Sequence, residues 1–300
     1  MFRLVHKPHR PGLAAELLES LFCGLPRIEK RVAVFVAAAD ESDGPKQTGP
    51  FVYGGFVGPT RDWIDCFAPA WQERVLNGRP TLPFFHMTEI RNPKWQVENG
   101  LLPWEADRRI DEAVCVVGSM GSIRLARTSF DGGHFRQTFQ SVRVARKGAQ
   151  AGGYPFEPDY IGFLGFARGV LEHVKSEYPD AEKVDFLVEK KQTVSHYMPN
   201  YLDMLEDWLT DNGRLDLVAL IGELNPRGDK TRVPLQAADL AMWHVRRHEA
   251  GESEAIDVRR LAQMFDGRTM ILTGMTNPEI TGVASRIKAR MASELKDGTS

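Results

Sequence analysis

Three acidic residues lie in segments that the hydrophobic pattern assigns to buried elements. Asp40 ends the apolar run RVAVFVAAAD, Glu189 ends the run VDFLVE, and Asp239 lies within LQAADLAMWH. Carboxylates are the ligands that Mg²⁺ and Mn²⁺ prefer, and two such ions can activate a water and stabilise the leaving oxygen of a phosphodiester. We therefore predict that Asp40, Glu189 and Asp239 converge as a divalent-metal site and act as catalytic residues.

Asp239 carries the clearest pattern of the three. Leu235, Met242 and Trp243 stand at helical spacing from it, so an apolar stripe surrounds its position and turns it inward. A carboxyl group in such a place must bind a cation, accept hydrogen bonds, or stay neutral because its pKa is raised. Gln236, one turn earlier, is predicted to orient Asp239. The alternative is an acid that only caps the helix or pairs with a neighbouring arginine.

Asp40 and Glu41 follow one another at the end of a buried strand, where the ligands of open α/β sheets gather. Because successive strand residues face opposite sides of a sheet, only one of them is expected to enter the same site. Asp40 is preferred, and Glu41 is kept as a further metal ligand. The alternatives are turn chemistry for this pair and a solvated strand-end charge for Glu189.

His86 and Glu89 in FFHMTEI are spaced so that they share one face if the segment is helical. Either residue could complete the ligands of the metal or assist proton transfer, so both are catalytic candidates. A histidine that only packs is the alternative reading. The chain has neither an HExxH pattern nor a CxxC pair, so Mg²⁺ or Mn²⁺ is expected rather than zinc.

Basic residues near these acids are predicted to bind substrate phosphates. They are Lys190, Lys191, Arg227, Lys230 and Arg232. Arg246 and Arg247, at the far end of the segment that holds Asp239, are expected to complement the C-terminal end of a helix instead.

Several function classes lack their sequence signatures. The chain has no GxSxG motif of a serine hydrolase, and no GxxxxGK[ST] or GxGxxG motif for nucleotide phosphates. Its three cysteines are far apart, its apolar runs fall short of the ~20 residues that span a bilayer, and its N-terminus lacks the apolar run of a secretory signal. A cytoplasmic protein is therefore expected. The formal net charge of −2 argues against a protein that coats nucleic acid indiscriminately, but it is compatible with a local basic groove.

Hydrophobic periodicity predicts three strands followed by alternating helices and strands. The expected strands span 31–40, 51–58, 122–130, 184–189, 215–224 and about 269–273. The expected helices span 11–23, 61–76 with an interruption at Pro69, parts of 84–119, 157–177, 196–211, 235–248 and about 277–295.

An antiparallel meander followed by parallel βα units predicts an α/β fold with a mixed five-stranded sheet flanked by helices. This order of elements is shared by ribonuclease H, integrases and many transposases. Residues 30–250 are predicted to form this ribonuclease-H-like domain, with 59–120 as a mostly helical insertion. Residues 1–29 would be an N-terminal helical extension, and 251–300 a C-terminal extension packed on the core.

Four motifs in this order resemble the family called domain of unknown function 3800, a ribonuclease-H-like group of bacteria and phages. They are AAADESDG, FVYGGFVG, FFHMTEI and LQAADLA, and the match covers about residues 31–250. The resemblance implies nuclease activity by analogy of fold. The sequence departs from the family at Asp43, where glycine commonly follows the serine, and at Glu189, where an aspartate is often found. Acidic roles are implied for Asp40, Glu41, Glu89 and Asp239, with His86 and Gln236 nearby.

These observations favour a Mg²⁺- or Mn²⁺-dependent nuclease that hydrolyses phosphodiester bonds in RNA or DNA. A second hypothesis is a catalytically inactive ribonuclease-H-like binding module of a bacterial defence or mobile-element system. The imperfect acid set and the near-neutral charge motivate this second hypothesis. A third hypothesis is a hydrolase of small phosphoesters. Under each hypothesis the chain could also bind a protein partner or form a homo-oligomer.

Overall fold

A computed structural model describes most of the chain between residues 34 and 285. The described ranges are 34–42, 49–140, 142–144, 154–155, 157–189, 199–227, 232–265 and 270–285, of which 34–42, 143–144, 154–155, 199–200 and 225–227 are described by their backbone alone. The predicted extension over 1–29 and three of the predicted phosphate-binding residues lie outside these ranges. Those three are Lys190, Lys191 and Lys230.

The strands form one main sheet and one small sheet. They are β1 (Val34–Ser42), β2 (Pro50–Pro59), β3 (Arg124–Asp131), β4 (Arg143–Val144), β5 (Tyr154–Pro155), β6 (Lys183–Glu189), β7 (Ile221–Arg227) and β8 (Ile271–Gly274). The strands β1, β2 and β3 pair antiparallel in chain order, whereas β6 joins β1, and β7 joins β6, in parallel. The carboxyl ends of β1, β6 and β7 therefore lie at one edge of the main sheet.

The prediction of a five-stranded sheet is wrong. Within the described residues the main sheet has six strands in the order β7-β6-β1-β2-β3-β8, and β4 and β5 form a separate two-stranded sheet. The extra strand of the main sheet is β8, which pairs in parallel with β3. A four-residue strand near the end of the chain joins this sheet only through long-range pairing, which sequence periodicity does not specify.

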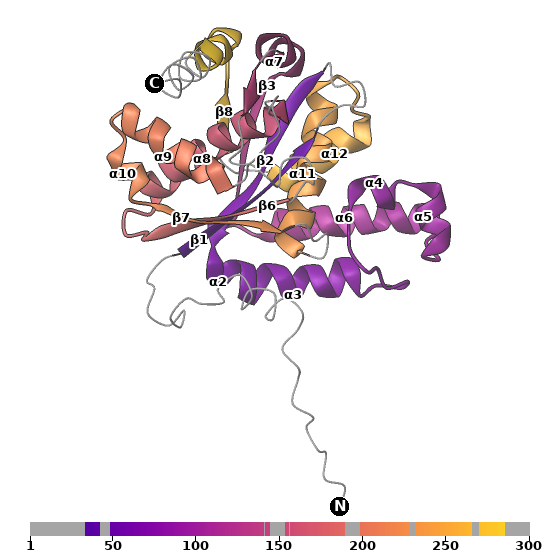
Figure 1. Cartoon of the computed structure of the whole chain (residues 1–300). Helices are drawn as coiled ribbons and strands as arrows, with labels where there is room; N and C mark the ends of the chain where they lie inside the picture. The colour runs from indigo at the N-terminus through magenta and orange to yellow at the C-terminus, as the bar shows by residue number, and fades with distance from the viewer. Residues whose placement is uncertain are drawn as a thin grey trace, which may run out of the picture.

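Helices cover both faces of the main sheet (Figure 1). They are α2 (Thr60–Asp62), α3 (Ala68–Trp71), α4 (Met87–Ile90), α5 (Pro93–Glu98), α6 (Pro103–Ser119), α7 (Gly132–Phe139), α8 (Pro158–Glu177), α9 (Pro199–Asp211), α10 (Leu215–Val218), α11 (Val233–Glu249) and α12 (Ala255–Phe265). The described residues 277–285 are helical as well. Among the described helices, none combines the length and the apolar character that crossing a membrane requires.

Two hydrophobic clusters show which helices cover which face. Phe51 and Tyr53 of β2 belong to the cluster that contains the buried residues of α8 and α9. Val52 and Phe56 of the same strand belong to the cluster that contains α3, α6 and α11. Because side chains alternate along a strand, β2 is buried on both faces, which explains the continuous apolar run FVYGGFV.

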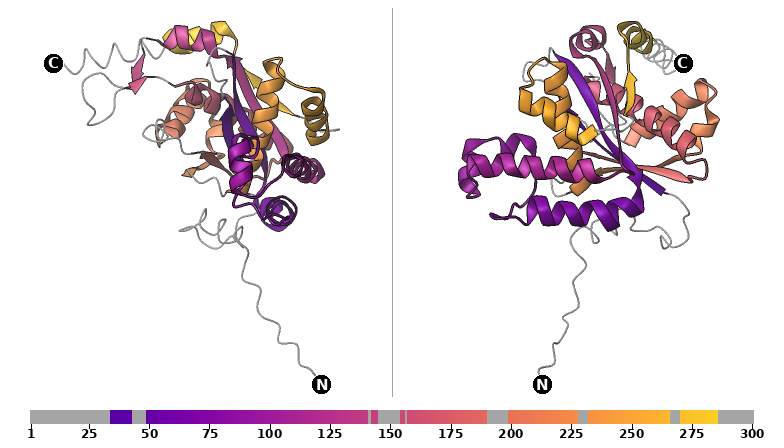
Figure 2. Two further views of the ribbon diagram at one scale, coloured as in Figure 1. Left: turned by 90° about the vertical axis from the view of Figure 1, so that its right-hand side faces the viewer. Right: turned by 180° about the vertical axis from the view of Figure 1, so that it is seen from behind.

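The segment 60–76 is one helical rod and is not broken at Pro69, contrary to the prediction. Two π-helical stretches, Trp63–Phe67 and Gln72–Leu76, flank the short α-helix that contains Pro69. Wider turns of this kind accommodate a residue without an N–H donor, so the helix continues. The rod packs along α6 (Figure 2) and buries Trp63 and Trp71.

The predicted strand over 215–224 is wrong in its first half. Residues Leu215–Val218 form α10, and β7 begins only at Ile221. A short apolar run fits the periodicity of a helix and of a strand equally well, so packing decides between them. Leu217 is buried whereas Leu215 is 63% exposed, so α10 buries one side of a single turn.

Candidate functional site

The side chain of Asp239 meets the segment that contains His86 and Glu89. The backbone N–H of Met87 donates a hydrogen bond of 2.6 Å to Asp239 Oδ2. His86 Nε2 lies 3.6 Å from Asp239 Oδ1, and His86 Nδ1 contacts Glu89 Oε2. The imidazole is therefore bracketed by two carboxylates from different elements.

Local backbone geometry explains why His86 can reach both acids. His86 precedes the first residue of α4 and has an extended conformation, with φ −149° and ψ 128°. Glu89 lies inside α4, one turn later, so its side chain returns toward His86. The expected helical pairing of His86 with Glu89 thus arises at a helix start rather than within a helix.

Burial and charge together shift the acidity of Asp239. Burial raises the pKa of the Asp239 carboxyl to about 6, His86 and the N–H of Met87 oppose this shift, and Glu189 and Glu89 add to it. Only 13% of the Asp239 side chain is exposed. The carboxylates of Glu89 and Glu189 therefore repel that of Asp239, and a bound cation would reduce this repulsion.

Glu189 reaches this cluster from the end of β6. Val188 is the register partner of Ala39, and Leu187 belongs to the hydrophobic cluster under α11. Glu189 is two residues beyond Leu187, so it takes the same face of the sheet. Its partly buried side chain is close enough to raise the pKa of Asp239.

The backbone register of β1 places Asp40 at the same end of the sheet. Asp40 is paired with Gly54, which lies between the two β2 residues, Val52 and Phe56, that face α11. Paired residues of antiparallel strands share a face, so the Asp40 position belongs to the α11 side. It is one residue beyond Ala39, the partner of Val188 at the end of β6.

Glu41 takes the opposite face of the sheet. Its register partner is Tyr53, which belongs to the cluster under α8 and α9. The predicted reserve ligand is therefore on the other side of the sheet from Asp239, because one step along a strand reverses the face.

Two comparisons with known proteins leave the site to be judged on its geometry. No protein-family model matches the chain. No curated protein matches it in sequence either.

The cluster contains the residue types of a site for a hard divalent cation, but not the arrangement. Its carboxylates come from β6, α4 and α11 and are the oxygen donors that Mg²⁺ and Mn²⁺ prefer, and one imidazole lies beside them. Among the side chains that the structure describes, no group of three or more His, Cys, Asp or Glu residues is arranged to hold a metal ion. The side chain of Asp40 is not among the described side chains.

The amide oxygen of Gln236 contacts the helical rod and the segment before His86. Its Oε1 accepts a hydrogen bond of 2.8 Å from Trp71 Nε1 and one of 3.2 Å from the backbone N–H of Phe85. It therefore anchors the segment that precedes His86. Sequence reasoning missed Trp71 and Phe85, because buried aromatic residues in an amphipathic segment show no sign of a polar role.

The predicted phosphate-binding residues are only partly described. Arg227 ends β7 and is the backbone register partner of Glu189, so it lies beside the acidic cluster along the sheet edge. Arg232 immediately precedes α11.

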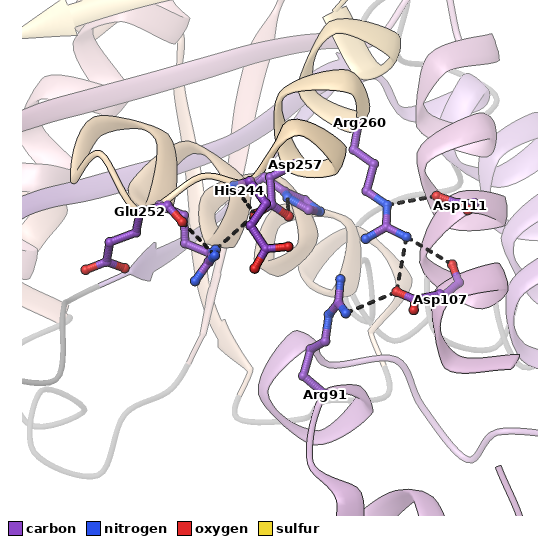
Figure 3. A network of polar contacts seen from close by, with 9 residues as sticks. Arg91, Asp107, Asp111, His244, Glu252, Asp257 and Arg260 are labelled. Atoms are coloured by element: carbon purple, nitrogen blue, oxygen red, sulfur yellow. Dashed lines mark hydrogen bonds and ion pairs between the residues drawn. The ribbon is translucent and has the colours of Figure 1, made fainter. Parts of the chain in front are cut away.

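A second polar network holds the far half of α11 (Figure 3). The buried His244 of α11 lies 3.3 Å from Asp257 of α12 through Nδ1, and Arg247 donates to the other oxygen of Asp257 at 3.2 Å. Burial lowers the pKa of His244 to about 4; Asp257 opposes this shift, whereas Arg260, Arg91 and Arg247 add to it. Arg247 therefore pairs with α12 rather than only complementing the helix end.

The same network ties α12 and α4 to α6. Arg260 lies 2.8 Å from Asp111 and 3.3 Å from Asp107, and Arg91 at the end of α4 lies 3.0 Å from Asp107 (Figure 3). Two guanidinium groups thus share the carboxylate of Asp107. Ion pairs therefore connect α6 with α4, which contains Glu89, and with α12, which packs against α11.

Proposed function

We propose that this protein is a divalent-metal-dependent nuclease that hydrolyses phosphodiester bonds, with Asp40, Glu189 and Asp239 as metal ligands. One observation carries the proposal. The imidazole of His86 contacts Glu89 and lies 3.6 Å from Asp239, Glu189 is near enough to raise the pKa of Asp239, and the β1 register places the Asp40 position at the same end of the sheet.

A bound Mg²⁺ or Mn²⁺ would polarise the phosphoryl oxygen and lower the pKa of a water. Asp239 would hold such an ion through Oδ1, because Oδ2 accepts the Met87 N–H and is kept in place by it. Glu189 and Asp40 would supply oxygens from neighbouring strands. His86, in contact with Glu89 and near Asp239, would carry a proton to or from the reacting oxygens.

The substrate of this proposed nuclease is RNA or DNA. Arg227, beside Glu189 in the sheet register, and Arg232 before α11 would contact phosphates on either side of the acids. The resemblance of four motifs to the domain of unknown function 3800 family supports the same activity and is itself part of the proposal. A cytoplasmic location is also part of it.

A binding module without turnover is the second candidate. The observation in its favour is that His86 contacts Glu89 and approaches Asp239, so the imidazole could bridge the two acids in place of a metal. In that case the acids would stabilise the fold or bind a partner of a bacterial defence or mobile-element system.

Titration calorimetry with Mn²⁺ and a cleavage assay with labelled single- and double-stranded RNA and DNA test the first candidate. Asp239→Asn keeps an oxygen that can accept the Met87 N–H but removes the charge, so we expect both Mn²⁺ binding and Mn²⁺-dependent cleavage to be lost. The matched control is Asp216→Asn in α10, where the side chain is exposed and paired with Arg214. It should behave as the wild type.

Two outcomes separate the candidates. Cleavage by Asp239→Asn at the wild-type rate would remove the proposed mechanism. Absence of Mn²⁺ binding and of cleavage in the wild-type protein would favour the binding module.

A further inference from the structure

The oxygen of the Gln236 amide joins three elements at a buried point. It accepts from the indole Nε1 of Trp71 at 2.8 Å and from the backbone N–H of Phe85 at 3.2 Å. Gln236 is 2% exposed and Trp71 fully buried, so water does not compete for these bonds. An indole N–H is a donor only, so it determines which end of the amide faces it.

Gln236 and Asp239 bind the same short extended segment. Gln236 accepts the N–H of Phe85, and Asp239 accepts the N–H of Met87, two residues later. Alternate residues of an extended chain direct their N–H groups to the same side, with a repeat of about 6.6 Å. Side chains three apart on a helix have Cβ atoms about 5–6 Å apart, so one face of α11 matches this repeat.

His86 is the residue between the two anchored N–H groups. Its own side chain approaches Asp239 and contacts Glu89, while its neighbours Phe85 and Met87 are buried. Fixing the backbone on both sides of one residue leaves its side chain few directions.

Trp71 is itself fixed by aromatic packing. Its ring stacks on Phe67 with centroids 5.5 Å apart and meets Phe85 edge-on at 5.4 Å. The same indole therefore packs against Phe85 and, through Gln236, holds the Phe85 backbone.

We propose that Trp71 and Gln236 are positioning residues that set His86 against Asp239. The effect of these residues on cleavage rests on the proposed function. Their effect on the position of His86 rests on the hydrogen bonds alone. Neither residue touches the reacting atoms.

Gln236→Leu removes the acceptor and tests the inference. The matched control is Thr128→Val, because Thr128 is also buried and its hydroxyl contacts that of Thr273 on the α8 side of the sheet, away from the His86 segment. Both variants lose one buried hydrogen-bonding group, so a purely structural effect should be similar in the two. Trp71→Phe is a milder variant that removes the N–H donor and keeps an aromatic ring.

The first readout is nuclear magnetic resonance of the metal-free protein. We expect Gln236→Leu, and to a smaller extent Trp71→Phe, to shift the backbone amide signal of Met87 and the ring signals of His86. Thr128→Val should leave those signals in place. Unshifted His86 and Met87 signals in both test variants, with the fold retained, would overturn the positioning role whatever the activity.

The second readout is the kinetics of Mn²⁺-dependent cleavage. A displacement of His86 on the order of 1 Å should lower kcat by up to roughly 10²-fold with little change in KM. Equal losses of kcat in Gln236→Leu and Thr128→Val would attribute the effect to stability alone and contradict the proposal. A wild-type protein that does not cleave would remove the proposed function, and the first readout would still decide the positioning role.

Discussion

Asp239 is the residue at which the largest opposing effects meet. Burial and two neighbouring carboxylates raise its pKa, while His86 and the Met87 N–H stabilise its charged form. A pKa of about 6 in the folded protein exceeds the ~3.9 of an unfolded aspartate. The folded state therefore binds more protons than the unfolded state between these values, and its stability falls as pH rises through that window.

Asp239→Asn should stabilise the metal-free protein most above pH 6. The gain should approach about 3 kcal/mol, because one pKa unit corresponds to about 1.4 kcal/mol, and should vanish near pH 4 where Asp239 is protonated in both states. Urea unfolding with a chelator present, at several pH values, measures the difference. A difference that does not vary with pH would show that the carboxyl ionises alike in both states.

At the scale of elements, α11 is anchored at two points by different chemistry. Near its start, Gln236 and Asp239 bind the segment before α4 through backbone N–H groups. Near its end, His244 and Arg247 bind Asp257 of α12. Because α11 is held near both of its ends, the position of Asp239 on it is fixed.

The second anchor should weaken in acid. The pKa of His244 in the folded protein is about 4 and that of an unfolded histidine is ~6.5, so stability is lost as pH falls from 6.5 toward 4. The loss should be on the order of 3 kcal/mol, because protonation places a charge in a site with no exposure. In His244→Gln this part of the pH dependence should disappear from denaturant unfolding curves. An unchanged slope would assign the acid sensitivity to other groups.

At the scale of the whole molecule, glycines let α8 approach the sheet. An added Cβ at Gly165 would lie 2.5 Å from Thr128 Oγ1, and one at Gly169 would lie 2.6 Å from Thr273 Cγ2. Thr273 of β8 also donates to the carbonyl of Gly165 at 3.0 Å. The sixth strand is therefore held by α8 as well as by β3.

Gly165→Ala should destabilise the protein by about 1–3 kcal/mol, because a methyl group there overlaps Thr128. The matched control is Gly282→Ala, at an exposed helical position where an added Cβ meets nothing within 4 Å. That control should gain about 0.5–1 kcal/mol from reduced backbone freedom. Thermal unfolding compares the two variants, and equal effects of the two substitutions would contradict the close approach of α8.

Local patterns determined the elements that carry the acids. The strands ending near Asp40 and Glu189, and the helix with Asp239 in an apolar stripe, follow from the spacing of apolar residues within about ten positions. The family resemblance and the nuclease hypothesis come from the same motifs and stay proposals.

Only the tertiary structure decided which groups these acids and amides contact. Trp71 and Gln236 are 165 positions apart, the Met87 N–H reaches Asp239 across 152, and β8 joins β3 from the far end of the chain. Such contacts depend on how elements pack in three dimensions, and periodicity along the chain holds no information about that distance. Sequence alone therefore predicted a carboxylate cluster, and the fold determined the backbone N–H that binds Asp239 and the indole N–H that binds Gln236.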